Sequence, residues 1–233
     1  MKRLFFNGYK EALNICKERY NKNLKTKIFT PNAEMFGDPK KSRILRHGDL
    51  LIPDGIGVYI GAKLVGLSPV ERTNGIDFAE KLVRLAQDEG LSIFLLGGRP
   101  QIATQAAIKL TEKNKGLKIT GTHHGYFEKS GVENRLVLNK IDASNADILF
   151  VCLGFPEQEK WICRNLPKLK NVKIAVGLAG SLDVWSGAVE RAPLFVRKIG
   201  LEWLWRVSSS PSRICRLPKL FNFIIFCFLK KME

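Results

Sequence analysis

Residues 76–100 read IDFAEKLVRLAQDEGLSIFLLGGRP, and this stretch decides the fold class. Its first half places apolar residues three and four positions apart, at Ile76, Ala79, Val83 and Ala86. This spacing predicts an amphipathic helix over 76–89 that ends at Gly90. Its second half contains the short apolar run 92–96, which is typical of a strand buried on both faces of a parallel sheet. A helix followed by such a strand indicates an α/β protein.

The alternation of strand and helix patterns extends along the whole chain. Strands are predicted over residues 26–29, 49–52, 92–96, 117–120, 147–153 and 172–176. The fold class is therefore α/β, with a Rossmann-like, mostly parallel sheet flanked by helices. A chain of 233 residues suffices for one catalytic domain, predicted over 1–199, with a C-terminal helical, membrane-associating appendage over 200–233.

Positive charge is concentrated towards the C-terminal end. The chain carries 38 Lys and Arg against 22 Asp and Glu, a net charge of +16. Residues 191–233 hold nine basic and two acidic residues, so +7 of this charge lies there and +9 in the other 190 residues. Such a balance favours partners that carry phosphate, namely nucleic acid, anionic lipid or a diphosphate substrate.

The basic segment also contains an apolar run. Residues 220–229 read LFNFIIFCFL, ten residues against the roughly 20 that span a bilayer. We expect this run to lie in the membrane interface, where anionic lipid would attract each flanking cation by about 1 kcal/mol. The alternative is a helix docked on the protein's own core.

Cysteine usage and the N-terminal residues bear on the compartment. The five cysteines form no Cys-x-x-Cys pair, so neither a zinc site nor a disulfide framework is indicated. Free thiols fit a reducing cytoplasm, and the N-terminal apolar run is too short for a signal peptide. We therefore expect a cytoplasmic protein, peripheral on the inner face of the cell membrane. The pair His123 and His124 matches no zinc spacing, which favours ordinary loop histidines.

Turns after predicted strands carry candidate site residues. Gly97 and Gly98 would let backbone amides and a helix N-terminus approach a phosphate, although such a turn is also ordinary punctuation and is not a GxGxxG fingerprint. Asp54 either caps the next helix or acts as a general base towards a sugar hydroxyl. Gln158, in the first turn of a predicted helix, either faces solvent or hydrogen-bonds a sugar or uracil. These residues by themselves leave both alternatives open.

Ordered motifs of several residues run through the chain. They are TPNAEM at 30–35, PDGIGV at 53–58, Arg72 with GID at 75–77, LGG at 96–98, GYF at 125–127, GFPEQE at 154–159, the segment 177–183, RAP at 191–193 and GLEWLWR at 200–206. In this order they resemble the WecG/TagA/CpsF glycosyltransferase family, over about residues 27–216.

The resemblance implies an inverting hexosyltransferase of cell-surface polysaccharide or wall teichoic acid biosynthesis. Such enzymes move an N-acetylmannosamine-type sugar from UDP to N-acetylglucosamine on an undecaprenyl diphosphate carrier. The matched motifs imply that Asp54 is the general base, that Thr30 and Asn32 line its pocket, and that Arg72 and Gln158 contact substrate. The matched arginines of the family's C-terminal appendage, which closes over the active site at the membrane, are Arg206, Arg213 and Arg216.

Metal-independent chemistry fits the residue types. An inverting transfer needs one base to deprotonate the acceptor hydroxyl while the leaving UDP gains negative charge. The sequence contains no Asp-x-Asp pair, whereas arginine forks bind diphosphate oxygens bidentately. We therefore expect no metal or cofactor, and as partners a UDP-sugar donor, a polyprenyl-diphosphate-linked sugar acceptor and an anionic membrane surface. The sequence does not determine whether the protein is a monomer or a homo-oligomer.

Other classes of function compete with this interpretation. A Rossmann-like oxidoreductase would need a dinucleotide fingerprint, which the sequence lacks. A nucleic-acid-binding or membrane-binding protein without catalysis would explain the charge, but no nucleic-acid-binding motif is found, and the aromatic-rich basic tail fits a membrane better. The sequence does not distinguish N-acetylmannosamine, its uronic acid or another UDP-hexose as donor, nor does it identify the polymer that is built.

Overall fold

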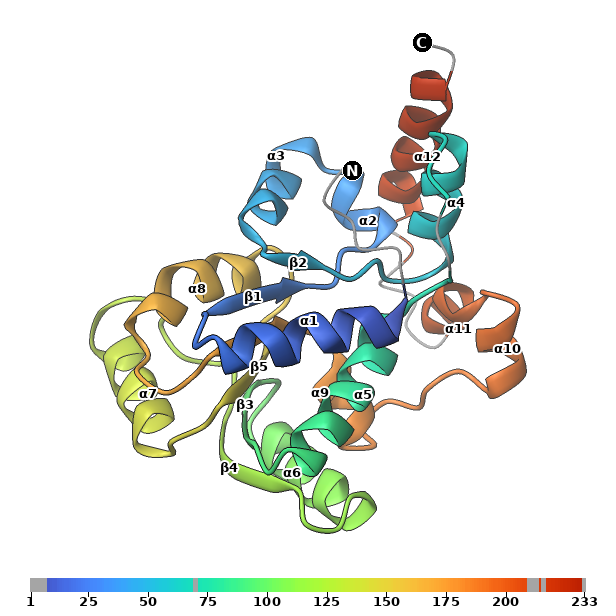
Figure 1. Cartoon of the computed structure of the whole chain (residues 1–233). Coiled ribbons are helices and arrows are strands. Elements are labelled where there is room, and N and C mark those ends of the chain that lie inside the picture. Colours follow the sequence, from blue (N-terminus) through green and yellow to red (C-terminus); the bar gives the residue numbers. More distant parts are fainter. Residues whose placement is uncertain (1–7, 69–70, 209–213, 215–216, 232–233) are drawn as a thin grey trace.

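The computed structural model describes residues 8–68, 71–208, 214 and 217–231 (Figure 1). Its first half contains α1 (Tyr9–Asn21), β1 (Thr26–Phe29), α2 (Ala33–Phe36), α3 (Pro39–Ser42), η1 (Arg43–His47), β2 (Leu50–Leu51), α4 (Ile56–Leu64), α5 (Gly75–Asp88), β3 (Ser92–Gly97) and α6 (Ile102–Lys113). Its second half contains β4 (Lys118–His123), α7 (Gly131–Ala143), β5 (Ile148–Cys152), α8 (Glu157–Asn165), η2 (Leu166–Lys168), β6 (Ile174–Gly177), α9 (Ser181–Trp185), α10 (Leu194–Lys198), α11 (Glu202–Ser208) and α12 (Leu217–Lys231).

The sheet has six strands in the order β2-β1-β6-β5-β3-β4, and every neighbouring pair is parallel. All six predicted strands are confirmed, as is the predicted helix, which α5 matches within one residue at each end. The second strand is shorter than expected, because only Leu50 and Leu51 pair with β1. The predicted α/β class with a parallel sheet is therefore confirmed.

Helices cover both faces of the sheet (Figure 1). One apolar cluster joins the first face of the sheet to α1, α5, α6 and α9. A second cluster joins the opposite face to η1, α7 and α8. Strands β3, β5 and β6 are buried on both faces, which explains why they appear in the sequence as continuous apolar runs rather than as alternating patterns.

The two faces determine where a crevice can form. After β3 the chain enters α6, which packs on the first face, whereas after β5 it enters α8 on the opposite face. Because β3 and β5 are neighbours in the sheet, the loops leaving them diverge. Ligands of open α/β sheets bind at such a switch point, outside the carboxyl ends of the strands.

Helix α12 lies alongside α4, away from the sheet (Figure 1). Phe223 and Cys227 are buried against α4 and α2, where the ring of Phe223 stacks on that of Phe36 with 5.6 Å between centroids. Gly61 allows this approach, because a Cβ at Gly61 would lie 2.6 Å from the Phe223 ring. One face of the apolar run is thus docked on the protein, as the alternative interpretation of this segment expected.

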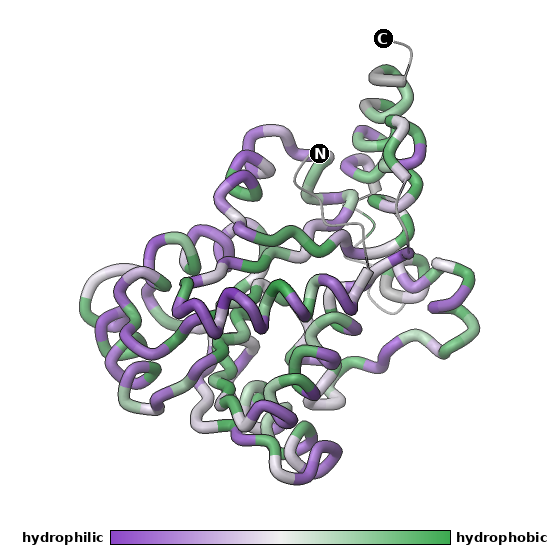
Figure 2. Tube along the Cα trace, viewed as in Figure 1, coloured by the Kyte–Doolittle hydropathy of each residue, from purple (hydrophilic) through white to green (hydrophobic). Residues whose placement is uncertain are grey.

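The other face of α12 is exposed. Figure 2 shows apolar residues along much of this helix, and the exposed fractions reach 56–60% at Phe221, Ile225, Phe228 and Leu229. Helices α10 and α11 also expose large apolar side chains, with Leu194 and Phe195 at 65% and 67%. Within the part of the chain that the structure describes, no helix is both long and apolar enough to cross a membrane.

Candidate active site

Asp54 lies in the loop between β2 and α4 and is fixed from two sides. Its backbone N–H donates to the carbonyl oxygen of Pro31 at 2.8 Å, which ties this loop to the one after β1. Its Oδ1 accepts from the backbone N–H of Gly75 at 2.8 Å, the first residue of α5. Asp54 therefore does cap a helix, although the helix is α5 rather than the next one in the chain, and its carboxylate stays half-buried at the carboxyl edge of the sheet.

Thr30 follows β1 and contacts both the end of β6 and the N-terminus of α5. It is buried, and its hydroxyl donates to the carbonyl oxygen of Gly177 at the end of β6, at 2.8 Å. A Cβ at Gly75 would lie 2.9 Å from that of Thr30, so the glycine permits the close approach of the α5 N-terminus. Thr30 and Asp54 consequently both contact the turn at Gly75, while their membership of one substrate site stays a prediction.

Gln158 is fully buried in the first turn of α8 and does not face solvent. Its Oε1 accepts from the backbone N–H of Ala179 at 2.9 Å, and its Nε2 donates to Oε1 of Glu159 at 2.8 Å. These contacts hold the loop after β6 against α8. Contact between Gln158 and a substrate stays a prediction, because the described partners of its carboxamide are protein atoms.

Glu159 is an unusual neighbour for that amide. It is fully buried, and burial raises the pKa of its carboxyl from 4.5 to about 7, while the hydrogen bond from Gln158 acts in the opposite direction. Its Oε2 has no hydrogen-bond partner among the described residues. No sequence motif assigns Glu159 a role of its own, since only its desolvated position in the fold makes it exceptional.

Asn32 and Arg72 occupy supporting positions. Asn32 is the N-cap of α2 and accepts from the backbone N–H of Met35 at 3.1 Å, which fixes the loop after β1. Arg72 donates to the backbone carbonyl of Arg197 at 2.5 Å and so ties α10 to the segment that precedes α5. Their contacts with substrate stay predictions.

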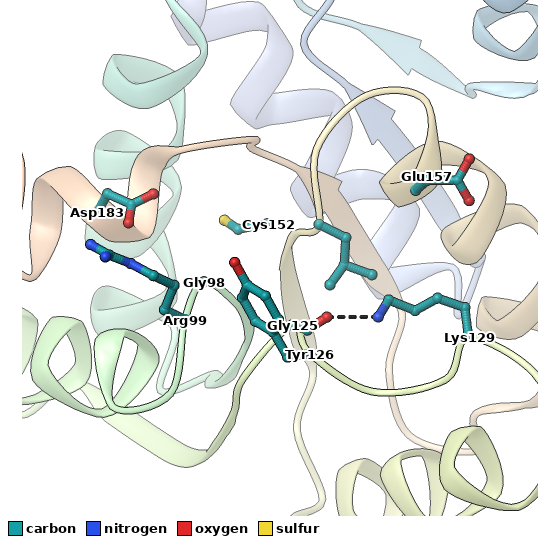
Figure 3. A pocket seen from close by; sticks show the side chains of 9 residues that line it. Gly98, Arg99, Gly125, Tyr126, Lys129, Cys152, Glu157 and Asp183 are labelled. Carbon is teal, nitrogen blue, oxygen red and sulfur yellow. Dashed lines mark hydrogen bonds between the residues drawn. The ribbon is translucent and has the colours of Figure 1, made fainter. Parts of the chain in front are cut away.

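A pocket of about 610 Å³ opens beside this group, at the switch point between β3 and β5 (Figure 3). It is lined by Gly98, Arg99, Gly125, Tyr126, Lys129, Cys152, Leu153, Glu157 and Asp183. Arg99 and Asp183 lie on one side of it, Glu157 and Lys129 on the other, and the Tyr126 ring between them. The volume falls within the roughly 300–1,000 Å³ typical of small-molecule sites.

The pocket walls combine a flat ring with two cations, Arg99 and Lys129, and two carboxylates, Glu157 and Asp183. Tyr126 is 68% exposed, so its face is accessible from the pocket. Lys129 donates to the carbonyl oxygens of Gly125 and Phe127 at 2.6 and 2.5 Å, and burial lowers the pKa of its ammonium. Arg99 is exposed at the rim. Such walls suit a ligand with both an aromatic ring and phosphate groups.

The glycine turn after β3 forms part of this wall. Gly97 has φ +137°, and a Cβ there would lie 2.3 Å from the carbonyl oxygen of Cys152, so only glycine allows β3 and β5 to pack this closely. The N–H of Gly98 donates to that same carbonyl at 3.2 Å. The turn thus shapes the pocket, while phosphate binding by its amides stays a prediction.

The segment 177–183 connects the pocket to Thr30, which contacts the same α5 turn as Asp54. The segment 177–183 supplies Gly177, which binds Thr30, Ala179, which binds Gln158, and Asp183, which lines the pocket. A ligand in the pocket and a second ligand at Asp54 would therefore lie at the same edge of the sheet. This is the arrangement that transfer of a group between two substrates requires.

Some of the predicted features cannot be placed. Arg206 lies on α11, of which only the backbone is described at this position, and Arg213 and Arg216 lie outside the described residues. Among the described residues no three His, Cys, Asp or Glu side chains group as metal ligands, and His123 instead lies 2.8 Å from the carbonyl of His124. The four cysteines that the structure describes, Cys16, Cys152, Cys163 and Cys227, are free thiols.

Comparison with known proteins identifies the group to which these features belong. The profile of the Glycosyl transferase WecG/TagA/CpsF family matches residues 5–233. The chain belongs to this family. It is similar to an N-acetylglucosaminyldiphosphoundecaprenol N-acetyl-beta-D-mannosaminyltransferase of Bacillus spizizenii, with 34% identity over 82% of this chain and 74% of the relative. A Bacillus subtilis protein of the same name is 33% identical over 82% of this chain and 76% of the relative.

Membership confirms the resemblance drawn from the ordered motifs and makes this chain a glycosyltransferase. The competing classes, an oxidoreductase and a non-catalytic binding protein, are therefore disfavoured. Motif matching predicted a role for Asp54, which stays a prediction, and assigned none to Tyr126, Lys129 or Asp183. The motifs 125–127 and 177–183 mark the turns after β4 and β6, but only the folded sheet brings these three residues to one pocket.

Proposed function

We propose that this glycosyltransferase moves an N-acetylmannosamine-type sugar from UDP to N-acetylglucosamine on an undecaprenyl diphosphate carrier, in cell-surface polysaccharide or wall teichoic acid biosynthesis. The observation that carries the proposal is that the Asp54 carboxylate and the pocket lie at the same edge of the sheet, where Thr30 contacts both Gly177 of the segment 177–183 and the α5 turn that binds Asp54. The names of two relatives that cover 82% of this chain support the sugar and the acceptor.

We place the UDP-sugar donor in the pocket at the switch point rather than beside Asp54. The Tyr126 ring offers a stacking face for uracil, and Arg99 and Lys129 bring positive charge to the walls for the diphosphate. The Gly97 turn lets β3 and β5 close behind it. The sugar would then extend along the loop 177–183 towards Asp54.

Asp54 is suited to activate the acceptor. A carboxylate that accepts from the N–H of Gly75 keeps a fixed orientation, and the positive end of α5 stabilises its charged form. In the proposed reaction Asp54 takes the proton of the acceptor hydroxyl while that oxygen bonds to the anomeric carbon of the donor and the bond to UDP breaks. Attack opposite the leaving group inverts the anomeric centre.

The proposed reaction uses arginines rather than a metal for the leaving UDP. Arg206, Arg213 and Arg216 follow the catalytic domain and match the family motif, and guanidinium groups bind diphosphate without a metal ion. The exposed apolar residues of α10, α11 and α12, together with the basic charge of residues 191–233, would place the protein on the inner face of the membrane, where the lipid carrier lies.

The proposal is tested with purified full-length protein, a short-chain diphosphate-linked N-acetylglucosamine acceptor and a panel of UDP-sugars. Transfer from UDP-N-acetylmannosamine or its uronic acid, with an inverted anomeric centre in the product, is the expected result. Transfer only from another UDP-hexose would refute the donor, and no UDP binding with no transfer would refute the function.

Two variants locate the donor in the same assay. Tyr126→Ala should weaken UDP binding by about tenfold through lost stacking. Arg84→Gln is the matched surface control, because Arg84 is exposed on α5 outside the pocket. Equal UDP affinity in Tyr126→Ala and wild type would place the nucleotide elsewhere.

A further inference from the structure

Arg191 lies between α9 and α10 and opens the RAP motif at 191–193, to which the reaction described above gives no role. Its side chain is only 13% exposed. A buried guanidinium needs partners of opposite charge, because water no longer solvates it. The partners of Arg191 therefore show what the residue holds together.

Three carboxylates from two helices surround the guanidinium. Its Nη2 lies 2.5 Å from Oδ1 of Asp77, and its Nη1 lies 3.8 Å from Oε1 of Glu80. Both acids lie in the first two turns of α5. The third, Glu202, is the first residue of α11 and places Oε1 3.9 Å from Nε of Arg191, with only 16% of its side chain exposed. The guanidinium therefore bridges α5 and the start of the appendage.

The α5 end of this bridge is the same turn that orients Asp54. Asp77 accepts from the side-chain amide of Asn74 at 3.0 Å, and the N–H of Gly75 donates to Asp54 at 2.8 Å. The hydroxyl of Tyr9 accepts from the N–H of Asn74 at 2.7 Å and holds the turn from the other side. A shift of Asp77 would consequently move the amide that fixes the proposed base.

At the appendage end, Arg191 and Glu202 form an ion pair without a hydrogen bond. Nε of Arg191 is buried and has no hydrogen-bond partner among the described residues, because Glu202 lies at 3.9 Å rather than at the roughly 2.9 Å of a hydrogen bond. A second tie, from Arg72 to the carbonyl of Arg197, holds the same stretch of chain. Helices α10 and α11 expose Leu194, Phe195 and Leu204 nearby, at 65%, 67% and 47%.

We propose that Arg191 is a positioning residue that latches α11 to the N-terminal turn of α5 and thereby fixes the amide that holds Asp54. The inference rests on the proposed role of Asp54 as base. Through these ion pairs, the position of α11 would determine the orientation of the Asp54 carboxylate. A residue that only stabilised the fold would affect folding but not this geometry.

Glu202→Gln is the principal variant, because it weakens the appendage end of the latch without removing the guanidinium from α5. On a water-soluble acceptor, kcat should fall about tenfold to a hundredfold with an unchanged KM for the UDP-sugar, since misorientation of a catalytic group affects the chemical step. Arg191→Ala should lower kcat at least as much, and the double variant should lose no more than Arg191→Ala alone. Arg191→Lys should rescue only part, because an ammonium lacks the fork.

Lys113→Ala is the control, because Lys113, at the end of α6, lies 4.0 Å from Oε2 of Glu80 on α5, and the substitution therefore removes an ion pair of α5 other than those of Arg191. Its kcat should match wild type. Hydrogen exchange over residues 72–78 gives an independent readout, and Glu202→Gln should accelerate exchange there by more than its lower stability accelerates exchange in the rest of the core.

Loss of activity only in proportion to the unfolded fraction, additive effects of the two substitutions, or unchanged exchange over 72–78 would each overturn the latch. If the wild-type protein transferred no sugar at all, the proposed function would fail. The exchange measurement would still decide whether the latch exists.

Discussion

Asp54 has two roles that one pair of substitutions separates. Its Oδ1 accepts from the N–H of Gly75 at 2.8 Å, which stabilises the fold, and its charge is proposed to deprotonate the acceptor, which serves only the reaction. Asn retains an oxygen for the hydrogen bond but cannot act as a base, whereas Ala loses both. Asp54→Asn and Asp54→Ala therefore form the test.

The expected magnitudes follow from these contacts. Asn and Asp cap helices about equally well, so Asp54→Asn should change the free energy of unfolding by only a few tenths of a kcal/mol. Asp54→Ala removes the cap and should cost about 1 kcal/mol, which corresponds to roughly 3 °C in melting temperature for a chain of this size. Turnover should fall by about a hundredfold to ten-thousandfold in both variants.

The assay combines thermal unfolding with steady-state transfer to a soluble acceptor. Asp38→Ala is the control, since Asp38 caps α3 by accepting from the N–H of Lys41 at 3.2 Å and does not line the pocket. This control should lose a similar amount of stability but retain wild-type turnover. If Asp54→Asn kept turnover within about threefold of wild type, the carboxylate would be a helix cap and not the base.

Three further predictions concern pH, the tail and metal ions. Burial raises the pKa of the Glu159 carboxyl from 4.5 to about 7, so the folded protein binds this proton more tightly than the unfolded chain does. The resulting stabilisation of the fold is complete below pH 4.5 and is lost as the pH rises through about 7. Wild type should therefore lose about 3 kcal/mol relative to Glu159→Gln over that interval in denaturant titrations, and parallel curves would contradict the burial argument. In the tail, Phe223→Ser should destabilise the docked helix by about 3 kcal/mol, whereas the pair Ile225→Ser and Phe228→Ser should keep its stability yet lose liposome binding. Transfer should persist in excess EDTA, and loss of activity that Mg²⁺ or Mn²⁺ restores would overturn the arginine-based mechanism.

Most of the sheet was predictable because β3, β5 and β6 are buried on both faces. Runs such as 92–96 and 147–153 are too short for typical helices and are followed by glycine turns, so length and flanking residues together indicate buried strands. The second strand was overestimated for the same reason: Ile52 is buried and apolar, but it follows the two residues that pair with β1. Apolar residues in the sequence indicate which positions are buried. Which of these positions pair as a strand depends on the path of the neighbouring backbone.

The site was predictable only where one motif lies at one strand end. Asp54 and Thr30 stand in turns directly after strands, and the sequence shows both the turn and the polar residue. The pocket instead draws on four separate loops, so Tyr126, Lys129 and Asp183 come together only through the order of the strands. Likewise, the partner that Asp54 caps belongs to α5 and not to the helix that follows it, which no local pattern reveals.

The apolar run 220–229 shows why composition overstates membrane affinity. Its residues divide between two surfaces, because Gly61 on α4 lets Phe223 and Cys227 pack against the protein while Phe221, Ile225 and Phe228 stay exposed. The docked residues contribute to folding and are not available to lipid. Only the exposed stripe can enter a bilayer, and a stripe along one side of a helix favours an orientation parallel to the membrane surface. Since α4 begins two residues after Asp54, the helix that anchors α12 starts at the loop of the proposed base.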